Sequence, residues 1–262
     1  MFDERSLPAN LAAVHDHHAR GAVVLNVDSD FETLPPAVAE DIGFFVDRID
    51  PVTYPAEWLP DDAPTPLSRL TGTTLVVGMP GDGTIVTTRQ TDPPVVLVKK
   101  RAEGTPDDFL DHLLADALVR LGVEAPERAL GFFGADYRRL DAAVREKGDG
   151  SPADAYQIAV ALFDAWLGLH TRPVVTEWET AFSRLHAAWV DAGERLTDRL
   201  STLPGAVARG EMTFTAATEY ACGAVRHGLD LPAPFSALDT AAYREHGAEY
   251  AVEWAERTYA AL

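Results

Sequence analysis

The segment TEWETAFSRLHAAWVDAGERLTDRLS, residues 176–201, is the stretch that decides the fold predicted for this 262-residue chain. Apolar residues recur in it at alternating steps of four and three positions: Trp178, Phe182, Leu185, Trp189, Ala192 and Leu196. This spacing places them on one face of a single helix, which at 1.5 Å per residue runs about 39 Å. We therefore predict a central helix in the second half of the chain, with other helices packed along it.

The first part of the chain carries the β-rich patterns. Residues 22–27 form an apolar run that predicts a buried strand. Residues 74–79, 84–89 and 95–100 are short β-rich runs separated by Pro80-Gly81-Asp82-Gly83 and by residues 91–94, and both separators have turn chemistry. The pattern predicts a three-stranded antiparallel meander.

Helical patterns dominate after residue 104. Thr105-Pro106-Asp107 is a strong helix start, Gly122 is a helix stop, and Ser151 is placed to cap another helix. The predicted class is α+β, with a small antiparallel sheet and flanking helices in residues 1–104 and a mostly helical array in residues 105–262. A second cut at the flexible joint of residues 148–150 and one continuous core are the alternatives.

Charge is the strongest feature of the composition. The chain has 41 acidic and 22 basic residues, a formal net charge of -19, and only three lysines, Lys99, Lys100 and Lys147. This composition resembles that of proteins from salt-accumulating haloarchaea, whose acidic surfaces stay hydrated in molar salt. An ordinary acidic protein from a GC-rich bacterium, which also favours arginine over lysine, is the alternative.

The same composition bounds the partners. Nucleic acid and anionic membranes both require a basic face, so we expect neither as a partner. We find no apolar run long enough to span a bilayer and no signal-peptide pattern, which predicts a cytoplasmic protein. Cys222 is the only cysteine and is read as a small buried side chain. We expect no cofactor and a small molecule or a protein as the partner, while the oligomeric state is left open.

One candidate metal motif lies in the first predicted helix. His15-Asp16-His17-His18 combines three imidazoles with a carboxylate, and His15 and His18 share one helix face. Asp16-His17-His18 resembles the signature of DHH-type phosphoesterases, although there the triplet follows a strand and here a strand follows it. A half-buried face of an amphipathic helix is the competing interpretation.

A second candidate metal motif, Asp28-Ser29-Asp30, follows the first predicted strand. It resembles the Asp-x-Asp of haloacid-dehalogenase phosphatases and of nucleotide-sugar transferases, in which paired carboxylates bind Mg²⁺. The phosphatases carry Thr or Val four residues after the first Asp, and this chain has Glu32 there. An acidic turn that leads into a helix explains Asp28 and Asp30 equally well.

The turn Gly81-Asp82-Gly83 and the basic run Lys99-Lys100-Arg101 form the candidate phosphate site. A glycine-rich hairpin, a strand that ends in lysine and an acidic helix resemble, in this order, the small lobe of protein kinases. Asp107 and Asp111 on the following helix are the acids placed to orient a lysine, and Asp111 is the one taken as a site residue. The structural interpretation is that Asp82-Gly83 is a hairpin turn and that the basic run is a solvated strand end.

Two functions follow from these patterns. We favour a non-catalytic binding or interaction protein of a halophile, because turn geometry already explains the glycines. The alternative is a nucleotide- or phosphate-handling enzyme, of the phosphotransferase kind, that uses the glycine-rich turn with Lys99 or Lys100. A structure in which the lysines meet Asp28 or Asp30 at one cleft favours a ligand site.

Overall fold

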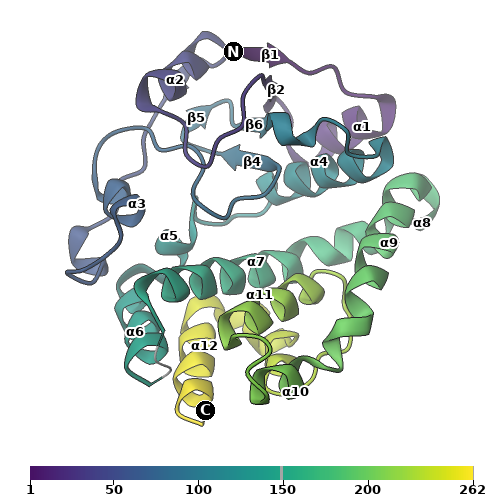
Figure 1. Ribbon diagram of the computed structural model, residues 1–262. Helices are drawn as coiled ribbons and strands as arrows, with labels where there is room; N and C mark the ends of the chain where they lie inside the picture. The colour runs from purple at the N-terminus through teal and green to yellow at the C-terminus, as the bar shows by residue number, and fades with distance from the viewer. Residues whose placement is uncertain (148–149, 262) are drawn as a thin grey trace. The chain divides into compact units, whose positions relative to one another are not determined.

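The computed structural model describes residues 1–147 and 150–261, so most of the predicted joint at residues 148–150 lies outside the described residues. The chain forms two compact units. Unit 1 comprises residues 1–54, 65–127 and 178–188, and unit 2 comprises residues 55–64, 128–177 and 189–262. The predicted α+β class is confirmed, because a small sheet lies in the first part of the chain and the later part is helical (Figure 1).

Unit 1 contains both strands and helices. They are β1 (Phe2–Glu4), α1 (Ala9–His18), β2 (Val23–Val27), α2 (Pro36–Glu40), η1 (Asp41–Phe44), β3 (Arg48–Ile49), α3 (Thr65–Ser68), η3 (Arg69–Thr71), β4 (Ile85–Thr88), β5 (Thr91–Asp92), β6 (Val95–Val98), η4 (Lys100–Ala102), α4 (Asp107–Leu121) and α8 (Trp178–Ala181).

Within the described residues of unit 2, every secondary-structure element is a helix. They are η2 (Ala56–Trp58), α5 (Ala129–Phe133), η5 (Gly134–Asp136), α6 (Tyr137–Ala142), η6 (Ala143–Lys147), α7 (Pro152–Thr176), α10 (Leu203–Ala208), α11 (Phe214–Val225), η7 (Phe235–Leu238) and α12 (Ala241–Tyr259). Helix α9 (Ser183–Leu200) begins in unit 1 and continues into unit 2.

The main sheet is mixed and has the strand order β1-β2-β6-β4. β2 pairs with β6 in parallel, while β1 and β4 pair antiparallel at the two sides. The antiparallel meander predicted for residues 74–79, 84–89 and 95–100 is therefore wrong in two respects. The strand of residues 22–27 joins this sheet, and residues 74–79 form no strand.

Residues 74–79 stay outside the ladder because their carbonyl groups are bonded elsewhere. The backbone N–H of Leu34 donates to the carbonyl of Val77 at 2.9 Å, and the side-chain amide of Gln90 donates to the carbonyl of Val76 at 2.8 Å. Gly78 then takes a φ of +77°, which interrupts an extended strand. The apolar residues of this segment are buried all the same, with Leu75 and Val77 in the core of unit 1.

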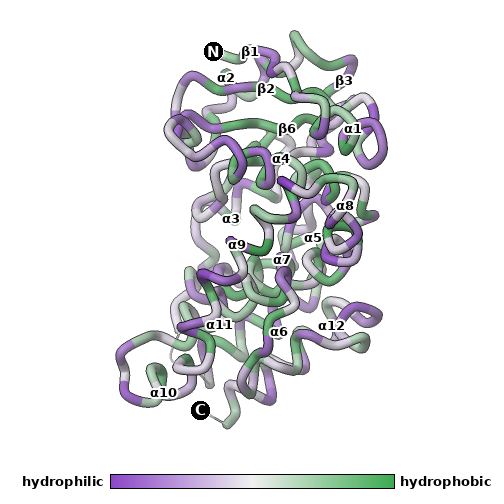
Figure 2. The backbone as a smooth tube through the Cα atoms, turned by 90° about the vertical axis from the view of Figure 1, so that its right-hand side faces the viewer, coloured by the Kyte–Doolittle hydropathy of each residue, from purple (hydrophilic) through white to green (hydrophobic). Residues whose placement is uncertain are grey.

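Strand β6 of the central parallel pair is fully apolar, and β2 is apolar except for Asn26. All four residues of β6 are buried, and Figure 2 shows this strand as a continuous hydrophobic run. Both strands of a parallel pair end at the same edge of the sheet, where ligands of α/β folds commonly bind. The residues that follow Val27 and Val98 are therefore brought to one edge, which we call the carboxyl edge.

α4 matches the helix predicted from Thr105-Pro106 to Gly122, and it belongs to unit 1 although it follows the boundary expected near Gly104. The physical reason is packing, because α4 lies against α1 and β4. Its buried residues include Leu110, Leu114 and Leu118. A composition shift along the chain marks where strands give way to helices, and it does not mark where one core ends.

Helix α7, not residues 176–201, is the central helix of unit 2, which corrects the prediction. It packs against α11 and α12 and buries residues on most sides, whereas α9 buries a single stripe that includes Leu185 and Trp189. A helix that is apolar all round belongs in a core, and one with a single apolar stripe lies at its surface. A capping box between Ser151 and Asp154 starts α7, as Ser151 predicts.

The apolarity of α7 has a second consequence. Among the described helices it alone is long and apolar enough, by length and composition, to cross a membrane. Its most apolar window is 61% buried inside the protein. The hydroxyl of Tyr243 on α12 also donates to the carbonyl of Leu162 on α7 at 2.6 Å, a contact made by a helix inside a packed core.

Candidate functional site

The carboxyl edge brings together residues that the sequence offered as separate motifs. Asp28 and Asp30 follow β2, and Lys99, Lys100 and Arg101 follow β6. Val98 pairs in register with Asn26, so the two charged runs start from neighbouring strands. Asp28 and Asp30 therefore lie at the same edge of the sheet as Lys99 and Lys100.

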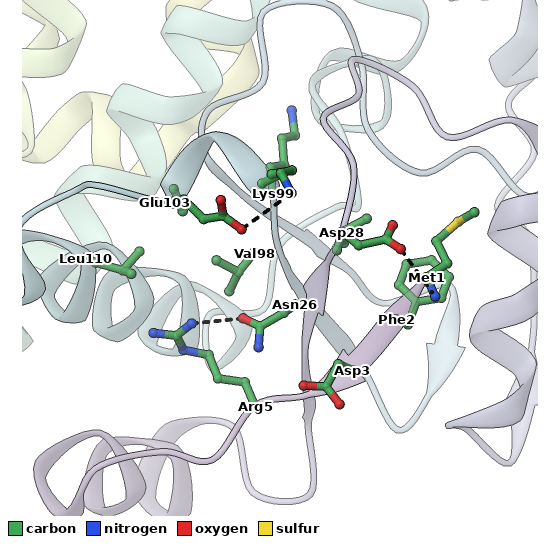
Figure 3. A pocket seen from close by; sticks show the side chains of 13 residues that line it. Met1, Phe2, Asp3, Arg5, Asn26, Asp28, Val98, Lys99, Glu103 and Leu110 are labelled. Atoms are coloured by element: carbon green, nitrogen blue, oxygen red, sulfur yellow. Dashed lines mark hydrogen bonds and ion pairs between the residues drawn. The ribbon is translucent and has the colours of Figure 1, made fainter.

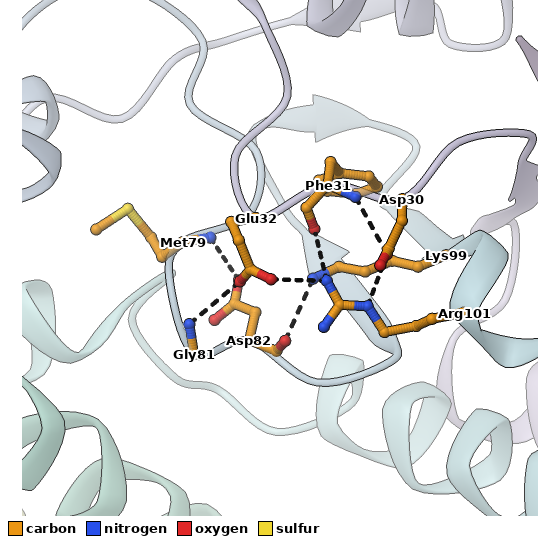
Figure 4. Close-up of polar contacts among 8 residues, drawn as sticks. All are labelled: Asp30, Phe31, Glu32, Met79, Gly81, Asp82, Lys99 and Arg101. Atoms are coloured by element: carbon orange, nitrogen blue, oxygen red, sulfur yellow. Dashed lines mark hydrogen bonds and ion pairs between the residues drawn. The ribbon is translucent and has the colours of Figure 1, made fainter.

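One group of charges at this edge is closed by its own ion pairs. We call Asp30, Glu32, Asp82, Lys99 and Arg101 the edge cluster (Figure 4). The guanidinium of Arg101 donates to the Asp30 carboxylate at 2.6 Å and to the Glu32 carboxylate at 2.7 Å. These hydrogen bonds hold the pKa of Asp30 and of Glu32 below their usual values and raise the pKa of Arg101.

Lys99 is the buried member of the edge cluster, with 1% of its surface exposed. Its Nζ donates to the backbone carbonyl of Asp82 at 3.2 Å and lies 4.8 Å from the centroid of the Phe31 ring. Burial lowers the pKa of Lys99, and the nearby Asp82 carboxylate opposes that shift. The ammonium group thus binds the glycine-rich turn through the carbonyl of Asp82 and also lies over the ring of Phe31.

The glycine-rich turn is tied to the same cluster. The N–H of Gly81 donates to Glu32 at 3.3 Å, and the N–H of Met79 donates to the Asp82 carboxylate at 2.8 Å. Gly81 has a φ of +92°, as the turn requires. In the edge cluster three carboxylates face two cations, so the charges a phosphate group needs are already neutralised. This arrangement favours the structural interpretation of Gly81, Asp82 and Gly83.

A pocket of about 470 Å³ lies beside the edge cluster, and we call it the edge pocket (Figure 3). Its volume is in the range of small-molecule sites. Val98 and Leu110 contribute apolar surface. The polar residues that line it are Asp3, Arg5, Asn26, Asp28, Lys99, Lys100 and Glu103.

The polar contacts inside the edge pocket differ from those of the edge cluster. Arg5 donates from Nη1 to the side-chain oxygen of Asn26 at 2.8 Å. Lys100 and Glu103 form a longer ion pair, 3.7 Å from Nζ to Oε1, and both side chains are more than half exposed. Asp28 lies 3.6 Å from the amino group of Met1. The charged groups of the pocket are therefore only loosely paired.

The remaining metal candidates do not gather into a site. His15 bonds through Nε2 to the carbonyl of Ala22 at 2.8 Å, and burial lowers the pKa of His18. Asp30 is held by Arg101. Within residues 1–147 and 150–261, no group of three or more His, Cys, Asp or Glu side chains is placed to hold a metal ion.

Asp111 lies on α4, where burial raises the pKa of its carboxyl group. Arg184 and Arg5 oppose that shift, and Arg184 forms an ion pair with the neighbouring Asp108. No hydrogen bond or ion pair among the described residues joins Asp111 to the edge cluster. The orienting role predicted for Asp111 toward a lysine therefore has no support from these contacts.

Four residues at the carboxyl edge were not among the predicted site residues: Arg5, Asn26, Glu32 and Glu103. Arg5 directly follows β1, whose three residues are too few for a periodic signal. Asn26 lies in β2 opposite Val98 of β6, a pairing that no local pattern reveals. Glu32 could have been found, because it lies two residues after Asp30, but its partner Arg101 is 69 positions away.

Comparison with known proteins places the whole chain in one family. Residues 1–262 match the model of a family of unknown function (DUF7089), and the chain belongs to that family. No curated protein and no solved structure matches the chain.

Proposed function

We propose that this member of a family without an assigned function is a non-catalytic binding protein that receives a small molecule in the edge pocket. The observation that carries the proposal is the loose pairing of Arg5, Asp28, Lys100 and Glu103 around a 470 Å³ pocket at the carboxyl edge. A small polar ligand requires charged groups that can exchange their present partners for the ligand, and an apolar surface beside them.

The neighbouring edge cluster supports a binding role over a catalytic one. Lys99 and Arg101 are the cations that a phosphotransferase would use, and both already hold parts of the chain together. Their acidic partners Asp30, Glu32 and Asp82 compete with any phosphate group. A phosphate group would have to displace these charge-assisted hydrogen bonds before it could bind.

A fragment screen in high KCl tests the proposal. Small carboxylates, amines, sugars and nucleosides are presented to the protein and binding is followed by ligand-observed NMR. We expect hits that disappear in Arg5→Gln, which removes the guanidinium from the edge pocket. Arg20→Gln is the matched control, because Arg20 is exposed in unit 1 and does not line the pocket. Hits that survive Arg5→Gln unchanged, or no hits at all, would exclude the edge pocket as a binding site.

The phosphate-handling enzyme remains the second candidate, because Gly81, Lys99 and Arg101 do meet at one edge. The same assay with ATP and Mg²⁺ separates the two. If the protein has the proposed non-catalytic binding function, we expect no nucleotide binding at millimolar concentration. Binding that is lost when Lys99 and Lys100 are both changed to alanine would favour the enzyme.

We also propose that the protein works in the cytoplasm of a halophile, as its charge indicates. At ~1 M salt the Debye length is about 3 Å, so the excess carboxylates of a chain with net charge -19 hardly repel one another. The thermal unfolding midpoint is expected to rise steadily as KCl is raised from dilute buffer to molar concentration. Midpoints that do not change with KCl would contradict the halophilic assignment and favour the ordinary acidic protein.

A further inference from the structure

We infer that the ligand of the edge pocket is a small zwitterion, a molecule with one carboxylate and one ammonium group on a short aliphatic body. The inference rests on the proposed function, since it names the class of ligand for the same pocket. It follows from three features of the lining: a guanidinium with unused donors, two loosely held carboxylates, and an apolar surface between them.

The guanidinium of Arg5 is the group suited to the carboxylate of the ligand. Arg5 has five N–H donors, and its described side-chain contact is the bond from Nη1 to Asn26. Its Nε is buried and has no hydrogen-bond partner in the described part of the chain. A guanidinium binds a carboxylate through two parallel hydrogen bonds, and the side-chain amide of Asn26 can add a third donor.

The carboxylates of Asp28 and Glu103 are suited to the ammonium group. Their present cationic partners lie at 3.6 and 3.7 Å, against 2.6 and 2.7 Å for the pairs that Arg101 makes in the edge cluster. Such long, exposed pairs contribute little to stability and are readily exchanged. A ligand ammonium can therefore replace the present partner of either carboxylate at small cost.

The arrangement of these groups matches a molecule with two separated charges. Figure 3 shows Arg5 and Asn26 in the lower part of the view, Glu103 and Asp28 in the upper part, and Val98 between them. The aliphatic body of the ligand would lie against Val98 and Leu110. The pocket thus offers the donors of Arg5 and Asn26, together with Asp3, on one side, the carboxylates of Asp28 and Glu103 on the other side, and an apolar surface between the two.

The charge of the lining argues against a phosphate or another multiply charged anion. The Nζ of Lys99 is bonded to the carbonyl of Asp82, which is not part of the lining. The other cations of the lining, the amino group of Met1, Arg5 and Lys100, are balanced by three carboxylates, those of Asp3, Asp28 and Glu103. A pocket without net positive charge gains nothing from a dianion, whereas a neutral zwitterion satisfies both signs.

Three molecules with the same unbranched aliphatic body test the inference. 5-Aminopentanoate carries an ammonium group at one end and a carboxylate at the other, pentanoate lacks the ammonium, and butylamine lacks the carboxylate. In titrations followed by ligand-observed NMR in high KCl, we expect 5-aminopentanoate to bind at least about tenfold more tightly than either analogue. The gain arises because only 5-aminopentanoate engages both sides of the pocket.

Pocket variants assign each half of the ligand. Arg5→Gln should reduce 5-aminopentanoate binding to the level of butylamine, and the double variant Asp28→Asn, Glu103→Gln should reduce it to the level of pentanoate. Arg20→Gln should leave all three affinities unchanged. Circular dichroism of each variant in the same KCl checks that it is folded.

Two outcomes overturn the inference. If pentanoate binds as tightly as 5-aminopentanoate, the pocket is an anion site, and the proposed binding function stands without the zwitterion. If 5-aminopentanoate does not bind, or binds both pocket variants as tightly as it binds the wild type, the zwitterion is excluded. The fragment screen then decides separately whether the edge pocket binds anything, so the two failures are distinguishable.

Discussion

Gly78→Ala is expected to destabilise unit 1 by about 3 kcal/mol or more. Gly78 has a φ of +77°, where a side chain adds about 1–2 kcal/mol of backbone strain. A Cβ built there also collides with the backbone oxygen of Glu32 and comes within 2.9 Å of the Phe31 ring. Neither neighbour can rotate away easily, so overpacking adds about 1–3 kcal/mol.

Gly81→Ala is the matched control for this prediction. Gly81 also has a positive φ, +92°, but a Cβ there meets nothing within 4 Å. Its cost should be the backbone strain alone, about 1–2 kcal/mol. Urea unfolding of both variants in high KCl gives the two losses, and amide hydrogen exchange locates them in unit 1. Equal losses would mean that the close approach of Gly78 to Phe31 and Glu32 does not stabilise the fold.

The comparison of Gly78→Ala with Gly81→Ala also tests the role of the edge cluster. Gly78 lies against Phe31 and Glu32, the two residues that link the edge cluster to the rest of unit 1. Phe31 lies beside Lys99, and Glu32 accepts hydrogen bonds from Arg101 and Gly81. A large specific loss at Gly78 would show that this loop is held as a rigid part of the core. The edge cluster would then be a structural device and not an open site.

Gly168→Leu is expected to destabilise unit 2 by about 3 kcal/mol, because it lies where α7 approaches the chain just beyond α11. A Cβ on Gly168 would come within 3.0 Å of the Cα of Arg226 and within 3.4 Å of its backbone nitrogen. A backbone neighbour cannot move aside as a flexible side chain does. The additional atoms of leucine must separate the two segments, and overpacking of this kind costs about 1–3 kcal/mol or more.

Gly223→Leu on α11 is expected to change the free energy of unfolding in the opposite direction. Gly223 is exposed and a Cβ there meets nothing within 4 Å. Leucine should therefore stabilise the helix by up to about 0.8 kcal/mol, because glycine is a poor helix former. Both variants are compared with the wild type by urea unfolding in high KCl. A stabilising Gly168→Leu would refute the close contact between α7 and Arg226.

Local sequence patterns predicted well where helices lie, but they predicted wrongly which helix is the central one. The stripe that includes Trp178, Leu185 and Trp189 is buried and helical, apart from breaks at residues 177 and 182. Its regularity nevertheless made α9 look central. A stripe stands out against polar residues on the opposite face, so the clearest period belongs to a surface helix. α7 is apolar on most sides and therefore has a weaker period, although it forms the core.

The candidate site was predicted in pieces. Asp30, Asp82, Lys99 and Arg101 were each identified from their motifs, and the structure brings them together. Their grouping could not be predicted because it depends on the parallel pairing of β2 with β6, which are separated by more than 60 residues. Arg5 and Glu103 lacked any motif, and their place in the edge pocket depends on that pairing too.

The sequence by itself determined the α+β class, the start of α4 and of α7, the strand of residues 23–27 and the strong acidity of the chain. These are local properties, set by side-chain periodicity, capping chemistry and composition. Only the tertiary structure decided that β2 and β6 are parallel, that Lys99 is buried against Phe31, and that a pocket opens beside it. These depend on contacts between distant segments, whose free energy exists only after the chain has folded.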